Sequence, residues 1–407
     1  MTKQVQDAYI VAVQRTPVGR APRGILRMTR PEDLIIHAIK GTLEKCPNLD
    51  PALIEDFILG CAMPEAEQGL NMARIVALLA GLPDTVPGVT VNRFCASGLQ
   101  SVAWAADRIR LGESDVILAG GVESMSQVPM GGNNPALHPD VVKDENFGIA
   151  YGMGMTAERV ADQWGITREA QDEFAVNSHA KALKAAENGW WSDEILPFTI
   201  HNRQPSADGR TVEDKTTEMT LDEGPRPGTS MEGLAKLRAV FATKGSVTAG
   251  NSSQTSDGAA AVVVMSERKM KQLGLEPIAR FVGYAVAGVP AEIMGIGPAK
   301  AVPLVMQQTG LRIEDMDWIE LNEAFAAQGL AVIKDLHMEG QLAAGIINPN
   351  GGAIALGHPL GGTGSIRVAT TLHGLRRKKR EGQNAKYGLV TMCIGTGMGA
   401  AGIFEMQ

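Results

Sequence analysis

Residues 90–121 read TVNRFCASGLQSVAWAADRIRLGESDVILAGG, a pattern typical of a turn, a helix and a buried strand. Residues 347–377 repeat this plan as INPNGGAIALGHPLGGTGSIRVATTLHGLRR, and the buried strand YGLVTMCIG follows at residues 387–395. Both helices open with small residues. A plan that occurs twice along one chain indicates an internal duplication.

Two further pairs of segments extend the repeat in both directions. Upstream, IEDF follows a helical pattern over about 31–45, and IEDMDW follows another over about 299–309. Downstream, GAAAVVVMSE from Gly258 matches GAAGIFEMQ from Gly399. Such apolar, β-branched runs suit strands that are covered on both faces. Strands alternating with helices in each half predict an α/β fold, with mixed sheets covered by helices and the halves packed as layered pseudo-twins.

The repeat is interrupted in the first half. In the first half, residues 122–246 lie between the last two predicted strands. In the second half, the two corresponding strands follow each other directly. We therefore expect three parts. The first half comprises residues 1–121 and is completed by residues 247–274, and the second half comprises residues 275–407. Residues 122–246 form an inserted lid or ligand-binding domain. Within the insertion, the sequence predicts an amphipathic helix at 168–188 and loops at NRQPSADGR and LDEGPRPGTS.

Composition excludes several classes of protein. The 407 residues carry a formal net charge of −7, which argues against a nucleic-acid binder. The run Arg376–Arg380 is interpreted as a solvated helix end rather than a phosphate site. Four widely spaced cysteines form no disulfide framework and no CxxC signature, which indicates a reducing compartment. The sequence shows neither a signal-peptide core nor eighteen consecutive uncharged apolar residues, so we expect a cytoplasmic protein without membrane insertion.

Cys95 lies where a strand pattern ends and a helical pattern begins. Unpaired amide groups and the positive end of the helix dipole would stabilise a thiolate there, which makes Cys95 a candidate nucleophile. Ala96, Ser97 and Gly98 leave room for a substrate. The alternative is a buried structural cysteine, because free cysteines are among the most buried residues.

Two glycine-rich segments of the second half also carry reactive side chains. His358 lies in GHPLGGTG ahead of a helix, and Cys393 opens CIGTGMG, a turn after a buried strand. Glycines permit close approach of a ligand to the backbone. A packed or surface histidine is the alternative for His358. Neither segment is a nucleotide site, since the P-loop lysine and the GxGxxG pattern are both absent.

Two polar segments complete the candidate site. NEAF, Asn322–Phe325, ends a strand pattern, where side chains commonly enter a site. TAGNSSQTSDGAA, residues 248–260, supplies hydroxyls and amides that could bind an amide-bearing arm; an ordinary polar loop is the alternative.

VNRFCASG, NEAFA, GHPLGGTG and CIGTGMGAA, in this order and at these separations, resemble the thiolase family over essentially the whole chain. GNSSQ, SDGAA and the ending CIGTGMGAA look more like degradative 3-ketoacyl-CoA thiolases than biosynthetic acetoacetyl-CoA thiolases. The resemblance implies the duplicated thiolase fold, two pseudo-equivalent halves in a layered α-β-α-β-α arrangement with an inserted loop domain. In YGMGMTAE, Gly152 stands where biosynthetic members have histidine.

The resemblance also implies a ping-pong mechanism in which CoA splits a 3-ketoacyl-CoA in fatty-acid β-oxidation. His358 would take the proton of Cys95, whose sulfur attacks the 3-keto carbon. Backbone N–H groups of Cys95 and Gly395 would hold the oxyanion. His358 and a water positioned by Asn322 would stabilise the acetyl-CoA enolate, and Cys393 would shuttle the protons.

Substrate-binding residues follow from the same resemblance. Arg226 would lie near the CoA nucleotide, Ser253 would bond the pantetheine arm, and Phe325 would bind substrate or CoA. Met153 and Met294 would lie near the acyl pocket; ordinary core methionines are the alternative. No metal or other cofactor is implied, because no cluster has ligand spacing and CoA is a substrate. The family resemblance further implies a homodimer or homotetramer, with a multifunctional β-oxidation enzyme as a possible partner.

Two other functions stay open from the sequence. One is an acetyl-CoA acetyltransferase that condenses two acetyl-CoA molecules. The other is a non-catalytic protein that binds CoA esters or lipids, which the joint presence of Cys95, Asn322, His358 and Cys393 disfavours.

Overall fold

A ten-stranded sheet runs through the protein, whose computed structural model describes residues 5–407. Along the sheet the strands follow the order β10-β11-β12-β9-β1-β8-β5-β3-β4, with β2 beside β8. The pairing of β1 with β9 involves only Tyr9 and Ile10, so the sheet has two parts that meet at one short junction. The strands of the first part are β1 (Ala8–Arg15), β2 (Gly19–Arg20), β3 (Asp56–Gly60), β4 (Gly88–Val91), β5 (Val116–Ser124) and β8 (Ser256–Ser266); those of the second are β9 (Ala279–Gly288), β10 (Met316–Leu321), β11 (Tyr387–Ile394) and β12 (Met398–Met406).

The predicted duplication is confirmed in the strand order and direction of the two parts. In the first, β3 runs parallel to β5, which is antiparallel to β8, which is antiparallel to β1. In the second, β10, β11, β12 and β9 repeat these relations in the same order. The segments that match in sequence therefore occupy equivalent strands, β3 with β10, β5 with β11 and β8 with β12.

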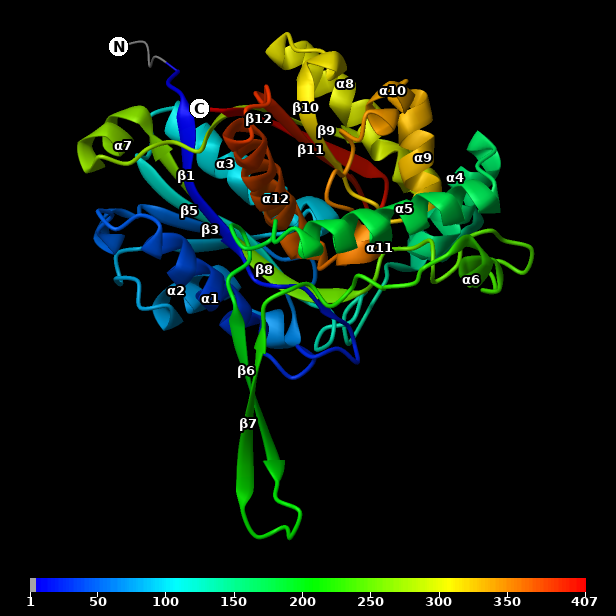
Figure 1. Ribbon diagram of the computed structural model, residues 1–407, viewed down its shortest axis with the longest axis horizontal. Coiled ribbons are helices and arrows are strands. Elements are labelled where there is room, and N and C mark those ends of the chain that lie inside the picture. Colours follow the sequence, from blue (N-terminus) through cyan, green and yellow to red (C-terminus); the bar gives the residue numbers. More distant parts are fainter. Residues whose placement is uncertain (1–4) are drawn as a thin grey trace.

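Helices cover both parts of the sheet and divide the core into layers. The helices are α1 (Pro31–Glu44), α2 (Met72–Leu79), α3 (Ser97–Arg110), α7 (Glu267–Leu273), α8 (Gly297–Thr309), α9 (Ala326–Asp335), α10 (Glu339–Ala343), α11 (Ala353–Leu356) and α12 (Leu360–Arg380), besides those of the insertion. One core cluster joins α3 and α12 to strands of both parts. A second packs α1 and α2 on the first part, and a third packs α8 and α9 on the second. The result is the expected α-β-α-β-α layering (Figure 1).

The two central helices approach each other so closely that their contact excludes side chains. A Cβ atom at Gly364 of α12 would lie 2.1 Å from the backbone nitrogen of Leu99 in α3. A Cβ atom at Gly98 of α3 would lie 2.7 Å from the nitrogen of Ser365. The small residues at the start of each helix are therefore required by this contact, which brings the N-termini of α3 and α12 together.

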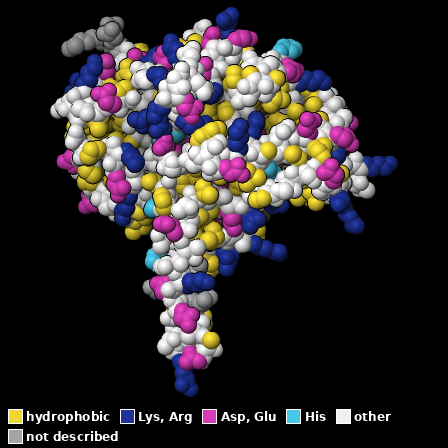
Figure 2. Space-filling model, viewed as in Figure 1, with side chains coloured by type: hydrophobic (Ala, Val, Ile, Leu, Met, Phe, Trp, Pro, Cys, Tyr) yellow, Lys and Arg dark blue, Asp and Glu magenta, His cyan; other side chains and the backbone are white. Residues whose placement is uncertain are grey.

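The insertion contributes α4 (Met153–Trp164), α5 (Arg168–Glu187), β6 (Phe198–Pro205), β7 (Val212–Met219) and α6 (Met231–Ala235). Helix α5 confirms the expected helix, but not its amphipathic character, because its buried face carries polar side chains such as Gln171 and Asp172 beside Phe174. The expected loop at NRQPSADGR was wrong for residues 202–205, which belong to β6, and right for residues 206–210, which join β6 to β7. The two strands pair as a hairpin that projects from the body as an arm (Figure 1). Charged side chains of both signs lie along this arm (Figure 2). Its polar sequence reflects exposure rather than a lack of regular structure.

A buried ion-pair cluster fastens the insertion to the first part of the sheet. Arg15 of β1 is 1% exposed and donates to Glu194 at 2.6 Å and to both carboxylate oxygens of Asp222 at 2.7 and 2.9 Å. Both acidic residues belong to the insertion. A two-pronged contact between Arg and carboxylate fixes orientation as well as distance, so the segment around Asp222 is held firmly beside β1.

The close helix contact predicts a strong effect of Gly364→Ala. The added methyl group must displace backbone of α3, and such overpacking costs about 1–3 kcal/mol of unfolding free energy. Urea unfolding at one protein concentration should show a lower midpoint with an unchanged slope. Gly340→Ala is the matched control, because a Cβ atom at Gly340 of α10 meets no atom within 4 Å. Equal midpoints for the two variants would contradict the proposed contact.

Candidate active site

Cys95 lies in a tight turn at the N-terminus of α3. The strand β4 ends at Val91, and a 3₁₀ turn, Phe94–Ala96, leads into the helix. The hydroxyl of Ser97 accepts from the amide of Arg93 at 2.9 Å and donates to the carbonyl of Phe94 at 2.7 Å. This local bonding holds the turn, so the predicted position of Cys95 between strand and helix is found in the structure.

The expected stabilisation of a Cys95 thiolate is outweighed by burial. Burial raises the pKa of Cys95 to about 12, although the backbone N–H groups of Gly395 and of Cys95 itself act in the opposite direction. The buried carboxylate of Glu123 adds a smaller upward shift. The sequence correctly indicated amide donors around this sulfur. It did not reveal how strongly burial opposes these donors.

His358 is held with one ring nitrogen free for proton transfer. Its backbone amide donates to the carbonyl of Gln254 at 3.1 Å. On the ring, Nδ1 lies 2.6 Å from the hydroxyl oxygen of Thr363. Because that hydroxyl donates its hydrogen to the carbonyl of Pro359, its oxygen accepts from Nδ1–H, and Nε2 keeps its lone pair. Burial, aided by the charge of Arg367, lowers the pKa of His358 to about 3, so the ring is neutral at pH 7.

Asn322 and Cys393 approach from the ends of neighbouring strands. Asn322 directly follows β10, and its Nδ2 lies 3.4 Å from His358 Nε2. Its side-chain oxygen is buried and has no partner within residues 5–407. Cys393 was expected in a turn, but it is the last residue but one of strand β11. It is fully buried, and both burial and the proximity of Cys95 raise its pKa well above the usual value.

These groups meet in a cleft of about 300 Å³ at the junction of the halves and the insertion. Of the residues assigned catalytic or binding roles from the sequence, seven line it: Cys95, Met153, Ser253, Met294, Phe325, His358 and Cys393. The segment 252–255 runs between the NEAF and GHPLGGTG motifs, bridging Phe325 at Ser252 and His358 at Thr255. Of the polar segment 248–260, residues 252–255 therefore form part of the wall, whereas residues 256–260 begin β8.

Comparisons with known proteins agree with this arrangement. The models of the thiolase N-terminal domain and the thiolase C-terminal domain match residues 8–268 and 275–406. The chain belongs to the thiolase family. A relative named 3-ketoacyl-CoA thiolase from Bacillus subtilis is 49% identical over 99% of this chain and 100% of its own. Another of that name from Vibrio parahaemolyticus is 47% identical over the full length of both.

Solved structures of thiolase-family proteins share the whole fold. An acetyl-CoA acetyltransferase from Bacillus anthracis has a TM-score of 0.87 and 39% identity, covering 100% of both chains. Human mitochondrial 3-ketoacyl-CoA thiolase has a TM-score of 0.86 and 36% identity, covering 99% of both. The expected family and fold class are thus confirmed.

Three residues predicted for this thiolase site lie outside the lining of the cleft. Asn322 reaches it through its contact with His358, and Gly395 through its amide near Cys95. Arg226 does not line the cleft. The residue is exposed, and the backbone amide of Arg226 donates to His179 Nδ1 at 3.2 Å. The segment that carries Arg226 is the one fastened by Asp222.

Sequence reasoning missed two residues that position the thiolase motifs. Thr363 selects the tautomer of His358, although GHPLGGTG stands out in the sequence only for its histidine and its glycines. Glu123 is fully buried in β5 and accepts from the amides of Ala62, at 2.8 Å, and Gly361, at 2.7 Å. It thereby caps the N-terminus of α12 with a negative charge, a favourable placement for the helix dipole. The only signal in the sequence was an acidic residue after an apolar strand.

Other parts of the cleft wall were also missed, among them Met125, Met130, Phe241 and Leu360. These residues are far apart in sequence, and isolated apolar side chains carry no sign of a ligand. Within residues 5–407 no three His, Cys, Asp or Glu side chains are grouped so that they could hold a metal ion. Over the same range, no helix has the length and apolar character needed to cross a membrane.

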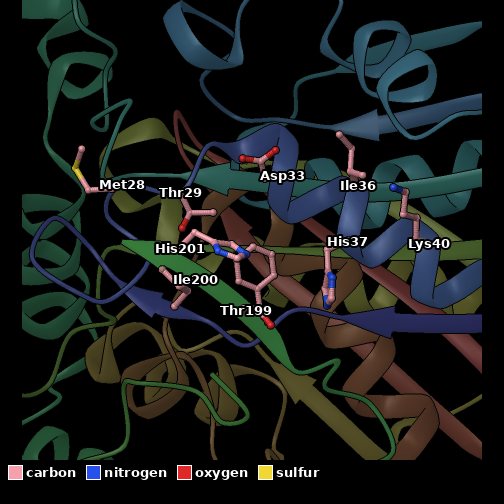
Figure 3. A pocket seen from close by; sticks show the side chains of 10 residues that line it. Met28, Thr29, Asp33, Ile36, His37, Lys40, Thr199, Ile200 and His201 are labelled. Atoms are coloured by element: carbon pink, nitrogen blue, oxygen red, sulfur yellow. The ribbon is translucent and has the colours of Figure 1, made fainter. Parts of the chain in front are cut away.

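A separate hollow of about 350 Å³ lies between α1 and the base of β6. Asp33, His37 and Lys40 line it from α1, and His201 from β6 (Figure 3). It shares no lining residue with the cleft that contains Cys95. None of the residues singled out from the sequence lies in it.

Removal of the Thr363 hydroxyl should impair His358 specifically. Thr363→Val keeps the shape of the side chain but leaves Nδ1–H without an acceptor, a loss of about 1–3 kcal/mol for a buried donor. We expect kcat to fall on the order of tenfold or more with little change in KM, and Thr363→Ser to restore most of it. A loss in KM alone, or an equal loss in the Ser variant, would contradict a role in orienting the imidazole.

Proposed function

We propose that this protein cleaves 3-ketoacyl-CoA with CoA, giving acetyl-CoA and an acyl-CoA shortened by two carbons, in fatty-acid β-oxidation. The observation that carries the proposal is a single cleft lined by two thiols and a neutral, oriented imidazole. The full-length similarity to proteins named 3-ketoacyl-CoA thiolase supports the substrate class.

The first half-reaction transfers the acyl group to Cys95. His358 Nε2 accepts the thiol proton as sulfur attacks the 3-keto carbon. The pKa values of about 12 for Cys95 and about 3 for His358 make a free ion pair unfavourable in the empty cleft. Proton transfer therefore accompanies attack, and the charge passes to the ketone oxygen. The N–H groups of Cys95 and Gly395 are suited to hold that oxygen, and such a donor contributes about 2.7–4 kcal/mol of transition-state stabilisation.

Carbon–carbon cleavage then releases acetyl-CoA. The bond between the 2- and 3-carbons breaks, its electrons form an enolate, and the acyl group stays on Cys95. Asn322 and His358 lie together where they can stabilise the enolate oxygen, and Cys393 supplies the proton to carbon. In the second half-reaction Cys393 deprotonates incoming CoA, and the CoA sulfur removes the acyl group from Cys95. His358 returns its proton to the departing Cys95 sulfur, which restores the thiol and the neutral imidazole. No redox partner or other cofactor is needed for this balance.

The insertion is proposed to hold CoA together with residues of both halves. Ser253 lines the cleft and is placed to bond the pantetheine arm, and Phe325, Met153 and Met294 are placed to contact the acyl end. Arg226 is exposed on the fastened segment and is proposed to attract the nucleotide phosphates. This assignment accompanies a proposed division into 1–121 with 247–274, an inserted CoA-binding domain at 122–246, and 275–407. Strand β5 extends to Ser124, so the strand itself crosses the first of these limits.

Condensation of two acetyl-CoA molecules is the second candidate, because a structural neighbour from Syntrophomonas wolfei and the one from Bacillus anthracis are both named acetyl-CoA acetyltransferase. Both candidates use the same site in opposite directions. Chain-length preference distinguishes them, since only β-oxidation requires cleavage of longer 3-ketoacyl-CoA substrates.

We also propose a cytoplasmic homodimer, or a homotetramer built from it, formed through β4. This strand lies at the end of the sheet, and among residues 5–407 it pairs only with β3. An edge strand with unpaired backbone groups readily pairs with another chain. Large apolar side chains are exposed around it, including Val89 at 40%, Leu79 at 60% and Trp104 at 44%. A multifunctional β-oxidation enzyme is a further proposed partner, for which no surface is assigned.

CoA-dependent thiolysis by the purified protein tests the function. Cys95→Ser should lower turnover by at least about 10³-fold, because a serine hydroxyl without comparable nucleophilicity replaces the thiol. Cys46→Ala is the control, since Cys46 lies in the outer core of the first half. Acetoacetyl-CoA and longer 3-ketoacyl-CoA esters are compared as substrates. Cleavage of acetoacetyl-CoA alone favours the acetyltransferase; cleavage of none, or unchanged turnover in Cys95→Ser, refutes the proposal.

The edge-strand dimer predicts a charge-sensitive assembly. Val89→Glu would place a desolvated carboxylate in the interface, so light scattering should show a shift from dimer towards monomer at micromolar concentration. Val212→Glu is the matched control, because Val212 is 70% exposed on the β6–β7 arm. A wild-type protein that is monomeric at all concentrations would rule out the dimer, and an unaffected Val89→Glu dimer would rule out this surface.

A further inference from the structure

Gly152 lacks a side chain at a position where neither the backbone nor the local packing requires glycine. It is the N-cap residue of α4, with φ −61° and ψ 148°, a conformation open to every residue type. A Cβ atom built there meets no atom within 4 Å. Helix N-caps favour Ser, Thr, Asp or Asn, whose side chains can accept a backbone hydrogen bond. Local structure alone would therefore favour another residue.

The neighbouring glycine shows the contrast. A Cβ atom at Gly154 would lie 2.2 Å from the ring of Phe241, so packing of that ring explains the glycine. Both glycines and Phe241 line the cleft that contains Cys95. At Gly152, by contrast, the missing side chain leaves open space, and the residue is exposed at the rim.

The wall that reaches this rim is apolar and adaptable. Four methionines line the cleft, namely Met125, Met130, Met153 and Met294. Unbranched thioether side chains adjust to irregular apolar partners. Met130 is 49% exposed, so the apolar lining continues to the solvent-facing side of the cleft.

Apolar surface also continues along the segment that leads into Gly152. Phe147 and Ile149 are 50% and 45% exposed. The Phe147 ring contacts Tyr151, directly before Gly152, with 5.5 Å between ring centroids. Arg159 of α4 places its guanidinium over the Tyr151 ring, 4.8 Å from the ring centroid. This contact helps to hold the segment in place. An acyl chain that leaves the cleft beside Gly152 would therefore find further apolar contacts.

We propose that Gly152 determines chain-length specificity: its missing side chain leaves an exit through which the acyl chain of medium and long 3-ketoacyl-CoA substrates extends from Cys95 over the rim. This inference rests on the proposed thiolysis and concerns only the fate of the chain beyond the reacting carbons. A short substrate such as acetoacetyl-CoA ends before the exit.

Gly152→Leu tests the exit by closing it. We compare kcat/KM for acetoacetyl-CoA, 3-ketooctanoyl-CoA and 3-ketohexadecanoyl-CoA in the wild type and the variant. The ratio of long-chain to acetoacetyl-CoA activity should fall on the order of tenfold or more, since a hydrophobic pocket discriminates by about that factor per poorly accommodated group. Gly152→Ala should give a smaller fall in the same direction, because its methyl group closes less of the gap.

Gly340→Leu is the matched control, because its Cβ atom also meets open space but lies on α10, outside the cleft. It should keep the wild-type ratio. A uniform loss over all chain lengths in Gly152→Leu, or an unchanged ratio, would overturn the inference. Wild-type protein inactive on every 3-ketoacyl-CoA would instead refute the proposed function, so the two failures are distinguishable.

Discussion

The close contact between α3 and α12 is the constraint on which the rest of the structure depends. Gly98 and Gly364 leave no room for side chains where the helices meet. Cys95 precedes the first helix and His358 precedes the second, so the distance between the helices sets the distance between the two functional groups. Glu123 reinforces this arrangement by binding the amide of Gly361 at the start of α12. The glycines that make the helices pack are therefore also the glycines that assemble the site.

Duplication explains the scaffold, but the site depends on the differences between the halves. Equivalent strands carry the same pairing pattern, yet the first half supplies Cys95 while the second supplies Asn322, His358 and Cys393. Residues 122–246, the proposed insertion, supply six further residues of the wall: Met125, Met130, Gly152, Met153, Gly154 and Phe241. A symmetric framework thus holds an asymmetric set of groups, as a reaction with distinct nucleophile, base and proton donor requires.

Burial governs the chemistry of the cleft more than any single charge. It is the largest cause of the raised pKa of Cys95 and of the lowered pKa of His358. Both groups therefore rest in their neutral forms. Negative charge is expected only on an oxygen that amide donors can bind. The same dryness favours an apolar acyl chain, for which the methionine wall and the open position at Gly152 are suited. Proton transfer and substrate selection thus share one physical origin.

The sequence by itself determined the duplicated α/β fold, the family and the positions of the reactive motifs, because apolar periodicity, small residues at close helix contacts and ordered motifs are local or repeated features. It did not reveal the β6–β7 arm, whose polar strands lack a buried face, or the roles of Glu123 and Thr363, whose partners lie on other segments or within a tight turn. The tertiary structure also sets the pKa of Cys95, which burial raises although nearby amide donors act to lower it. Helix-end amides can be predicted from position, whereas desolvation depends on everything that packs around the sulfur, and only the folded chain decides that.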